Sequence, residues 1–205
     1  MATQKALNFV TITSSMRPGR MSDRVLAVAL KAIKEQGHDY TVMDPKELNF
    51  PMLERPIHWY PSKTQAPQWL QDAEATMLSA DAFLFISGEY NRCVPPALAN
   101  IINHFGPNVF SAKAAGIISY SLGNGGANVR FSLAPMIQEL GGMPTPAQCC
   151  INFVSKKLNE EGEFQEPDST DAAAIASKVQ RVVKQTAWYA SAFINHRRDF
   201  GDLPN

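Results

Sequence analysis

Short apolar runs alternate with longer stretches of helical period along most of the chain. Runs rich in β-branched and apolar residues predict five strands, at 7–13, 40–44, 81–87, 114–121 and 149–155. Apolar residues that recur every three or four positions predict five helices, at 25–36, 65–79, 96–105, 129–140 and 170–197. This alternation predicts an α/β fold, in which helices cover both faces of a doubly wound parallel sheet.

The strand pattern also indicates where a ligand should bind. The run 81–87, DAFLFIS, is almost wholly apolar, as expected for a central parallel strand buried on both faces. Such sheets bind ligands beyond the carboxyl ends of their strands, so the loops after the first, third and fourth strands form the candidate site. We find no repeat or linker, and we expect residues 1–205 to form a single domain.

Composition narrows the possible functions. Hydrophobic residues make up 45% of the 205 residues, and 19 Lys and Arg balance 19 Asp and Glu, which gives a formal net charge of zero. Neutrality argues against a nucleic-acid partner, which needs a basic face, and against a strongly acidic electron carrier. The three cysteines lack metal-binding spacing and indicate a reducing compartment. With no signal peptide and no membrane-spanning apolar run, we expect a cytoplasmic protein without metal or membrane partner.

The first candidate loop, TSSMRPGRMS at 13–22, carries four hydroxyl side chains and two arginines directly before a predicted helix. A helix N-terminus has free N–H donors and partial positive charge, and the arginines add charge, so a phosphate monoester is the natural ligand. The patterns GxxxxGK[ST] and GxGxxG are absent, which disfavours a nucleoside triphosphate or a dinucleotide there. The alternative is an ordinary polar turn in which Ser22 caps the helix.

The second and third loops offer groups that suit a planar heterocycle. In SGEYNRCVPP at 87–96, Gly88 permits tight backbone geometry and Tyr90 offers a flat face with a polar tip. In SYSLGNGGANVR at 119–130, three glycines allow the backbone to approach a ligand closely. By itself, each loop is also compatible with a plain turn that begins a helix.

Together the three loops resemble the NADPH-dependent FMN reductases and their quinone, azo and chromate reductase relatives. The resemblance covers about residues 7–190 and is carried by SSMRPGRMSDRV, GEYNRCVPPALANIINHF and GNGGANVRFSLAPMIQELGGMPTP. It implies a flavodoxin-like three-layer sandwich, with a five-stranded parallel sheet in the order 2-1-3-4-5, and a homodimer or dimer of dimers. The sequence departs from the family pattern where Gly88 replaces the usual proline before the glutamate.

The resemblance also assigns candidate cofactor-binding residues. Those matched to the FMN phosphate are Ser14, Arg17 and Ser22, with Arg20 as a further candidate. Those matched to the flavin ring and the loop beside it are Ser87, Glu89, Tyr90, Asn91, Ser121, Gly123 and Gly125.

The activity implied by the resemblance is FMN-dependent NAD(P)H oxidoreduction. Hydride would pass from NADPH or NADH to FMN and on to a quinone, an azo compound, a metal oxyanion or free flavin. The flavin carries the chemistry, so we predict no catalytic residue. A non-enzymatic FMN electron carrier and a flavin redox sensor are the alternatives.

The sequence leaves open the roles of the long loop after the second predicted strand and of the cysteines. Trp59 and Tyr60 lie on a long proline-rich loop, and long loops in compact domains are often lids. They could stack on nicotinamide or acceptor, or they could form a subunit contact. Cys93 lies in the second loop, and a redox role and a plain surface thiol are the alternatives for it. Cys149 and Cys150 fall in a predicted buried strand, where cysteine acts as a small apolar residue.

Overall fold

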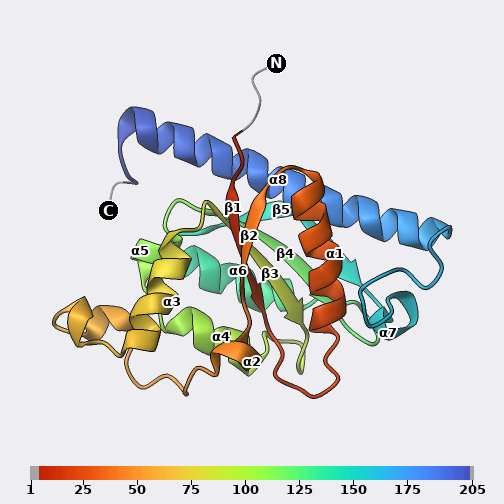
Figure 1. Cartoon of the computed structure of the whole chain (residues 1–205), viewed down its shortest axis with the longest axis horizontal. Helices are drawn as coiled ribbons and strands as arrows, with labels where there is room; N and C mark the ends of the chain where they lie inside the picture. Colours follow the sequence, from red (N-terminus) through yellow and green to blue (C-terminus); the bar gives the residue numbers. More distant parts are fainter. Residues whose placement is uncertain (1–4, 204–205) are drawn as a thin grey trace.

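The computed structural model describes residues 5–203, and a single five-stranded parallel sheet runs through them (Figure 1). The strands are β1 (Asn8–Thr13), β2 (Asp39–Met43), β3 (Ala82–Gly88), β4 (Ala114–Tyr120) and β5 (Met143–Ile151). Their order is β2-β1-β3-β4-β5 and every neighbouring pair is parallel. The predicted fold class and strand order are confirmed.

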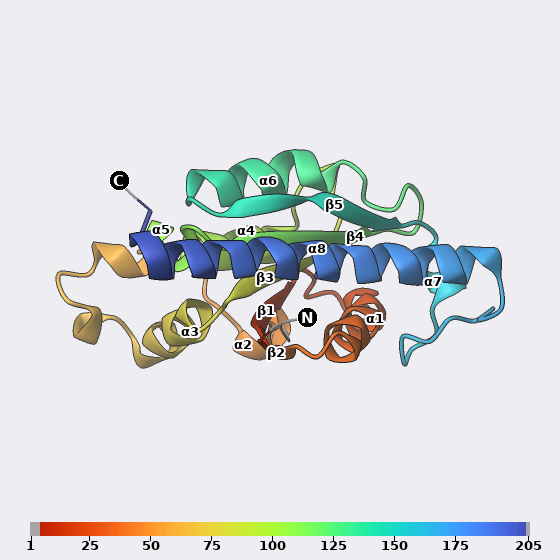
Figure 2. The ribbon, with the colours of Figure 1, turned by 90° about the horizontal axis from the view of Figure 1, so that it is seen from above.

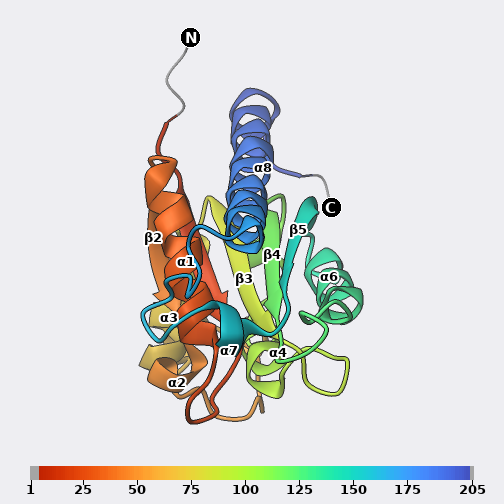
Figure 3. The same ribbon diagram turned by 90° about the vertical axis from the view of Figure 1, so that its right-hand side faces the viewer.

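Helices cover both faces of the sheet, as Figures 2 and 3 show. One face carries α1 (Ser22–Glu35) and the long α8 (Thr170–Phe200). The other face carries α3 (Gln68–Leu78), α4 (Pro96–Asn103), α5 (Pro107–Phe110) and α6 (Val129–Glu139). Because side chains alternate along a strand, Leu84 of β3 packs under the first layer, while Phe83 and Phe85 pack under the second.

The proline-rich loop after β2 is more ordered than the sequence indicates. It contains the short helix α2 (Pro45–Leu48) and two 3-10 turns, η1 (Ile57–Trp59) and η2 (Lys63–Gln65). The side chain of Asp44 caps α2, accepting a hydrogen bond from the backbone N–H of Lys46 at 2.9 Å.

The predicted position of the fifth strand, 149–155, is wrong, because β5 spans Met143–Ile151. Two prolines, Pro144 and Pro146, make 143–148 look unlike a strand. However, β5 is an edge strand, and its register with β4 shifts between Ala115 and Ile117, so prolines are tolerated there. The chain then leaves the sheet at Phe153, whose φ of 49° lies in the left-handed region, and forms α7 (Val154–Lys157).

Lys113, just before β4, is only 9% exposed. Its Nζ donates to the last carbonyls of α3, those of Met77 at 3.2 Å and Leu78 at 3.0 Å. Burial, with a smaller effect of the positive charge of Arg197, lowers the pKa of Lys113 from 10.5 to about 8.

This lowered pKa predicts a pH-dependent stability. Between pH 8 and 10.5 the unfolded chain keeps a proton on Lys113 that the native protein has lost, so the native state gains stability as pH rises. Relative to a Lys113→Met variant, the free energy of unfolding should rise by at most about 1.4 kcal/mol per pH unit in that window. Urea denaturation of both proteins across the window measures this difference. Parallel pH curves would show that Lys113 keeps its ordinary pKa.

Candidate functional site

A cavity of about 290 Å³ opens at the carboxyl edge of the sheet, which is the lower edge in Figure 1. The loops after β1, β3 and β4 meet there, as the sequence predicts, and the start of α7 completes the wall. The lining residues are Ser15, Arg17, Pro18, Gly19, Arg20, Met21, Gly88, Glu89, Tyr90, Tyr120, Ser121, Leu122 and Val154.

Arg20 is held by two carboxylates. Its Nη1 lies 2.6 Å from Oδ1 of Asp44, its Nη2 contacts the second oxygen of Asp44, and its Nε donates to Asp23 at 3.1 Å. The Arg20 side chain is only 7% exposed, and hydrogen bonding to Asp44 raises its pKa further above its usual value. Nη1 also donates to the carbonyl of Ser15 at 2.8 Å. Arg20 therefore joins the first loop to the end of β2.

Arg17, in contrast, is exposed and forms no ion pair within residues 5–203. Its guanidinium carbon lies 3.8 Å from the ring centroid of Tyr90, in a cation–π contact. The hydroxyl of Tyr90 lies 2.7 Å from Oγ of Ser15. Arg17 is thus the cation of the first loop that remains available to an anion.

The structure gives the serines of the first loop different roles. Ser14 is fully buried, and its Oγ accepts a hydrogen bond from the backbone N–H of Gly88 at 2.9 Å, while its neighbour Ser15 lines the cavity. Ser15 was missed by the sequence prediction. Ser22 begins α1, and its buried Oγ has no hydrogen-bond partner among the described residues. The backbone N–H groups of the first turn of α1 also have no side-chain acceptor among the described residues. The N-terminus of α1 can therefore bind an anion.

The second loop is a tight hairpin turn. Tyr90 and Cys93 exchange two backbone hydrogen bonds, of 3.1 and 2.9 Å. Between them Asn91 and Arg92 have φ values of 51° and 65°, and two left-handed central residues are typical of a type I′ turn. This turn places Asn91 at an exposed tip, so its side chain is not part of the cavity wall.

Glu89 holds the second and third loops together. Its carboxylate accepts hydrogen bonds from the backbone N–H of Asn128 at 2.8 Å, from the Asn128 side chain at 3.2 Å and from Asn124 at 3.3 Å. Burial by itself would raise the pKa of Glu89, but these hydrogen bonds and the charge of Arg92 lower it below its usual value. Glu89 thus caps the start of α6 from a neighbouring loop.

The third loop takes its shape from Ser121. Its Oγ accepts hydrogen bonds from the backbone N–H groups of Gly123 at 3.1 Å and Gly125 at 2.7 Å. Gly125 and Gly126 have φ values of 79° and 73°, which explains why glycine is needed there. Ser121 lines the cavity, whereas Gly123 and Gly125 shape the loop without lining it. The buried Ser87 donates to the carbonyl of Gly88 at 2.9 Å and also lies outside the wall.

Gly88 and Tyr120 form a pair that the sequence prediction missed. A Cβ at position 88 would lie 3.2 Å from the Tyr120 hydroxyl oxygen and 3.3 Å from its ring Cζ. Tyr120 is 6% exposed, and burial raises its pKa. A proline at position 88 would crowd this ring and would lack the N–H that Gly88 donates to Ser14. The packing of the Tyr120 ring against position 88 therefore explains why glycine stands there in place of the proline of the family pattern.

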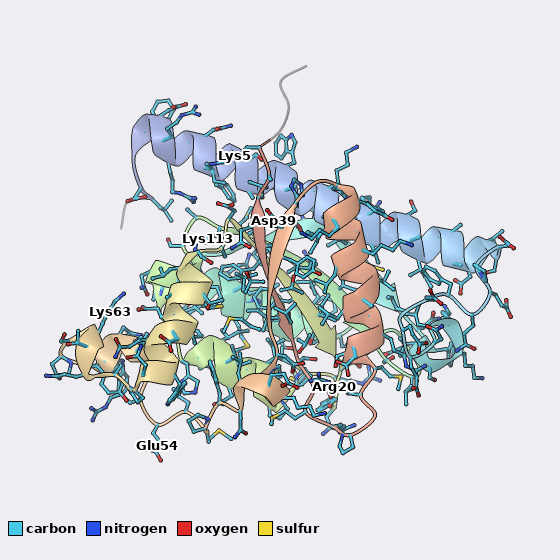
Figure 4. The ribbon with its side chains drawn as sticks, in the orientation of Figure 1. Lys5, Arg20, Asp39, Glu54, Lys63 and Lys113 are labelled. Atoms are coloured by element: carbon cyan, nitrogen blue, oxygen red, sulfur yellow. The ribbon has the colours of Figure 1, made fainter. Side chains whose placement is uncertain are left out.

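Trp59 and Tyr60 lie outside this cavity. Trp59 ends η1 and is 67% exposed, and Tyr60 lines a separate cavity together with Trp69 and His104. In Figure 4, Glu54 and Lys63, which flank this segment, lie well to one side of Arg20.

The cysteines and the other expected features add little to the site. Cys93 is exposed, Cys149 is buried and Cys150 is half-buried, and none of them is in a disulfide. Burial, with a smaller effect of Cys150, raises the pKa of Cys149 to about 12.

Within residues 5–203 no group of three or more His, Cys, Asp or Glu side chains could hold a metal. In the same range, no helix is both long and apolar enough to cross a membrane.

Known proteins resemble the chain in sequence. The family model for NADPH-dependent FMN reductases matches residues 7–156. A potato (Solanum tuberosum) protein named NAD(P)H:quinone oxidoreductase is 26% identical over 180 residues, which are 85% of each chain. A rice (Oryza sativa subsp. japonica) protein named probable NADPH:quinone oxidoreductase 2 is 29% identical over 132 residues, 63% of each chain.

Solved structures share the fold. FerB, a flavoenzyme NAD(P)H:(acceptor) oxidoreductase from Paracoccus denitrificans, superposes with a TM-score of 0.73 at 18% identity, covering 90% of this chain and 99% of that one. RosB superposes with a TM-score of 0.66 at 10% identity, covering 96% of this chain and 82% of that one.

The Gly88–Tyr120 contact predicts a graded loss of stability. Gly88→Ala adds only the crowded Cβ and should lower the free energy of unfolding by about 1 kcal/mol. Gly88→Pro also removes the hydrogen bond to Ser14, and the total loss should reach about 2–4 kcal/mol. Gly123→Ala is the control, because a Cβ there meets nothing within 4 Å. Urea denaturation of the cofactor-free proteins gives the three values, and equal values for all three would refute the contact.

Proposed function

We propose that this chain, which belongs to the NADPH-dependent FMN reductase family, is a quinone reductase that uses NAD(P)H. Family membership makes it an oxidoreductase with FMN as its cofactor and NAD(P)H as its co-substrate. The proposal concerns the acceptor, the residues of the site and the assembly. The observation that carries the site assignment is that Arg17, in the loop before α1, pairs with no carboxylate within residues 5–203, and no side chain in that range caps the helix.

The donors in the first loop fit the phosphate of FMN. Within residues 5–203 Arg17 pairs with no carboxylate, Ser15 lines the cavity, and no side chain caps the start of α1. A dianion accepts hydrogen bonds from all of these groups and is stabilised by the helix dipole. We assign the phosphate to Arg17, Ser15 and the free backbone N–H groups at the start of α1, whereas the fully buried Ser22 hydroxyl does not line the cavity. Arg20 and Ser14 would hold the loop in place rather than contact the phosphate.

The rest of the cavity suits a planar ring. When bound, FMN supplies the redox chemistry, accepting hydride from nicotinamide and passing reducing equivalents on. Tyr90 and Tyr120 offer aromatic surface, and Leu122 and Val154 add apolar surface. Glu89 keeps the third loop, and with it Ser121 and Leu122, in position at the cavity. No side chain is required as a general base.

A quinone is the acceptor that the observations favour. The potato and rice relatives are named as quinone oxidoreductases. Leu122 is 65% exposed at the cavity and presents an apolar surface that suits a neutral ring better than a metal oxyanion. Azo compounds, metal oxyanions and free flavin are the competing acceptors.

The proposal includes a cytoplasmic homodimer of single-domain chains. Both hydrophobic clusters pack on one sheet, which supports one domain, and free cysteines suit a reducing compartment. Trp59 is two-thirds exposed outside the cavity of its own chain, so the expected contact with nicotinamide or acceptor would be made in a second copy.

The function is tested on the purified protein. We expect a bound flavin that is FMN on extraction, and steady oxidation of NADPH or NADH with 1,4-benzoquinone at a higher kcat/KM than with an azo dye, chromate or free flavin. Bound FMN without turnover of any acceptor would instead indicate an electron carrier or sensor. Faster turnover with one of the other acceptors would show that this compound, and not a quinone, is the preferred acceptor.

The two arginines of the first loop should behave in opposite ways. Arg17→Ala should weaken FMN binding by about ten- to a hundredfold, the value of a charge-assisted hydrogen bond, without changing the stability of the cofactor-free protein. Arg20→Ala should lower that stability by about 3 kcal/mol, because Asp44, with a side chain only 11% exposed, loses its partner. Fluorescence titration with FMN and urea denaturation of both variants separate the two effects. If Arg20→Ala weakens FMN binding without lowering the stability, the phosphate contact belongs to Arg20.

A further inference from the structure

The three loops at the carboxyl edge of the sheet contain no lysine and four arginines, which are Arg17, Arg20, Arg92 and Arg130. Arg20 is held by two carboxylates, and Arg17 lines the cavity and is assigned to the phosphate of FMN. Nη2 of Arg130 donates to the carbonyl of Thr145 at 2.9 Å, and its Nη1 is buried. These three side chains therefore serve the fold or the cofactor site, which leaves Arg92 without a role.

Arg92 is an exposed cation beside the cavity. Within residues 5–203 its side chain forms no ion pair with a carboxylate. It nevertheless acts on Glu89, which lines the cavity. Burial alone would raise the pKa of Glu89, but hydrogen bonds from Asn128 and Asn124 lower it, and the positive charge of Arg92 adds to their effect. The guanidinium of Arg92 therefore lies near the mouth of the cavity.

The backbone at position 92 favours a different residue. Arg92 has a φ of 65° at the second central position of the type I′ turn, where glycine is the preferred residue. Glycine adopts this left-handed conformation without strain, whereas a bulky side chain with positive φ is uncommon. Asn91 is thus followed by arginine where Asn-Gly would form the more stable turn. Strain of this kind is typical of functional positions.

The turn that carries Arg92 is fixed to the rest of the fold. Tyr90 and Cys93 exchange two backbone hydrogen bonds, of 3.1 and 2.9 Å. The backbone N–H of Val94 donates to Oγ of Ser132, in α6, at 3.1 Å. The backbone position of Arg92 is therefore set, while its exposed side chain can reach an anion outside the cavity.

The co-substrate of the family supplies such an anion. With FMN in the cavity, the nicotinamide of NAD(P)H must approach from the mouth, and the rest of the dinucleotide must lie on the surface beyond it. NADH carries a pyrophosphate there, and NADPH carries a 2′-phosphate as well. A guanidinium binds phosphate oxygens through its planar fork of donors. These groups fit an exposed arginine at the mouth better than a neutral quinone does.

We propose that Arg92 binds a phosphate group of NAD(P)H at the mouth of the cavity. The inference rests on the proposed function, because it takes the cavity to be occupied by FMN. It makes Arg92 a binding residue for the co-substrate that has no part in holding the cofactor. The strained backbone at position 92 is retained for this contact.

The test measures binding of NADP⁺ and NAD⁺ to the FMN-loaded protein by isothermal titration calorimetry. These oxidised forms cannot reduce the flavin, so the result does not depend on any acceptor. Arg92→Gly should weaken NADP⁺ binding by about five- to tenfold, between the values of an exposed ion pair and a charge-assisted hydrogen bond. An equal loss for NAD⁺ places the contact at the pyrophosphate, and a smaller loss places it at the 2′-phosphate.

The same change should stabilise the cofactor-free protein. Glycine relieves the strain of the left-handed conformation, so the midpoint of urea unfolding should move to higher urea. An arginine with a merely structural role would not combine weaker NADP⁺ binding with a more stable fold. Arg92→Lys keeps the charge and should retain part of the affinity. Added NaCl should weaken binding less in Arg92→Gly than in the unsubstituted protein.

Two matched changes separate charge from backbone. Arg181→Ala removes another exposed arginine, on α8 and outside the cavity, and should leave the affinity for both dinucleotides unchanged. Asn49, the residue after α2, also has a positive φ, of 45°. Asn49→Gly should raise the urea midpoint without changing dinucleotide binding.

Three results would overturn the proposal. The first is unchanged affinity for both dinucleotides in Arg92→Gly, or no binding of either to the unsubstituted protein. The second is an equal loss of affinity in Arg181→Ala, which would show that only the net charge matters. The third is a matching loss of FMN affinity in Arg92→Gly, which would assign Arg92 to the cofactor. A protein that binds no FMN would contradict the proposed function itself, whereas each of these results leaves FMN bound.

Discussion

Three neighbouring parallel strands, β1, β3 and β4, end at one edge of the sheet and thereby position the loops that form the site. In the ladder between β3 and β4, Gly88 stands beside Tyr120, and one strand away Thr13 of β1 stands beside Ile86. The chain therefore leaves the sheet three times within a small area. Hydrogen bonds between the emerging loops, such as that from Gly88 to Ser14, then fix the cavity. Few of these contacts would exist if the register slipped by one residue, because each side chain would change faces.

Within this frame, most charges of the site are used for structure. Asp44 and Asp23 hold Arg20, and backbone and amide N–H groups hold Glu89. These carboxylates fix loops to one another, which makes the arrangement rigid before any ligand arrives. Arg17 stands apart because it rests on an aromatic ring and not on a carboxylate. A formal net charge of zero for the chain thus conceals Arg17, a cation lining the cavity that pairs with no carboxylate within residues 5–203.

The sequence predicted the elements well because their signals are local, and it failed where distant partners decide. Helical spacing and apolar strands located the sheet, but the prolines of β5 could not be recognised as edge-strand residues before the sheet order was known. Arg17 and Arg20 look equivalent in the sequence. They differ because Asp44, 24 residues from Arg20, folds back against it and holds it together with Asp23. Tyr120 was overlooked because its partner, Gly88, is notable only for the side chain that it lacks.

The long helix α8 has a consequence for the synthesis of the protein. Its residues Val179, Val182 and Val183 cover one face of the sheet, yet all of them follow the end of β5. All five strands are synthesised before α8, so until α8 is complete the part of that apolar face that it covers has no helix over it. Such a nascent chain is prone to aggregate and is a natural client for chaperones. Folding can therefore be completed only after the last helix has emerged, although all three loops of the site are made before it.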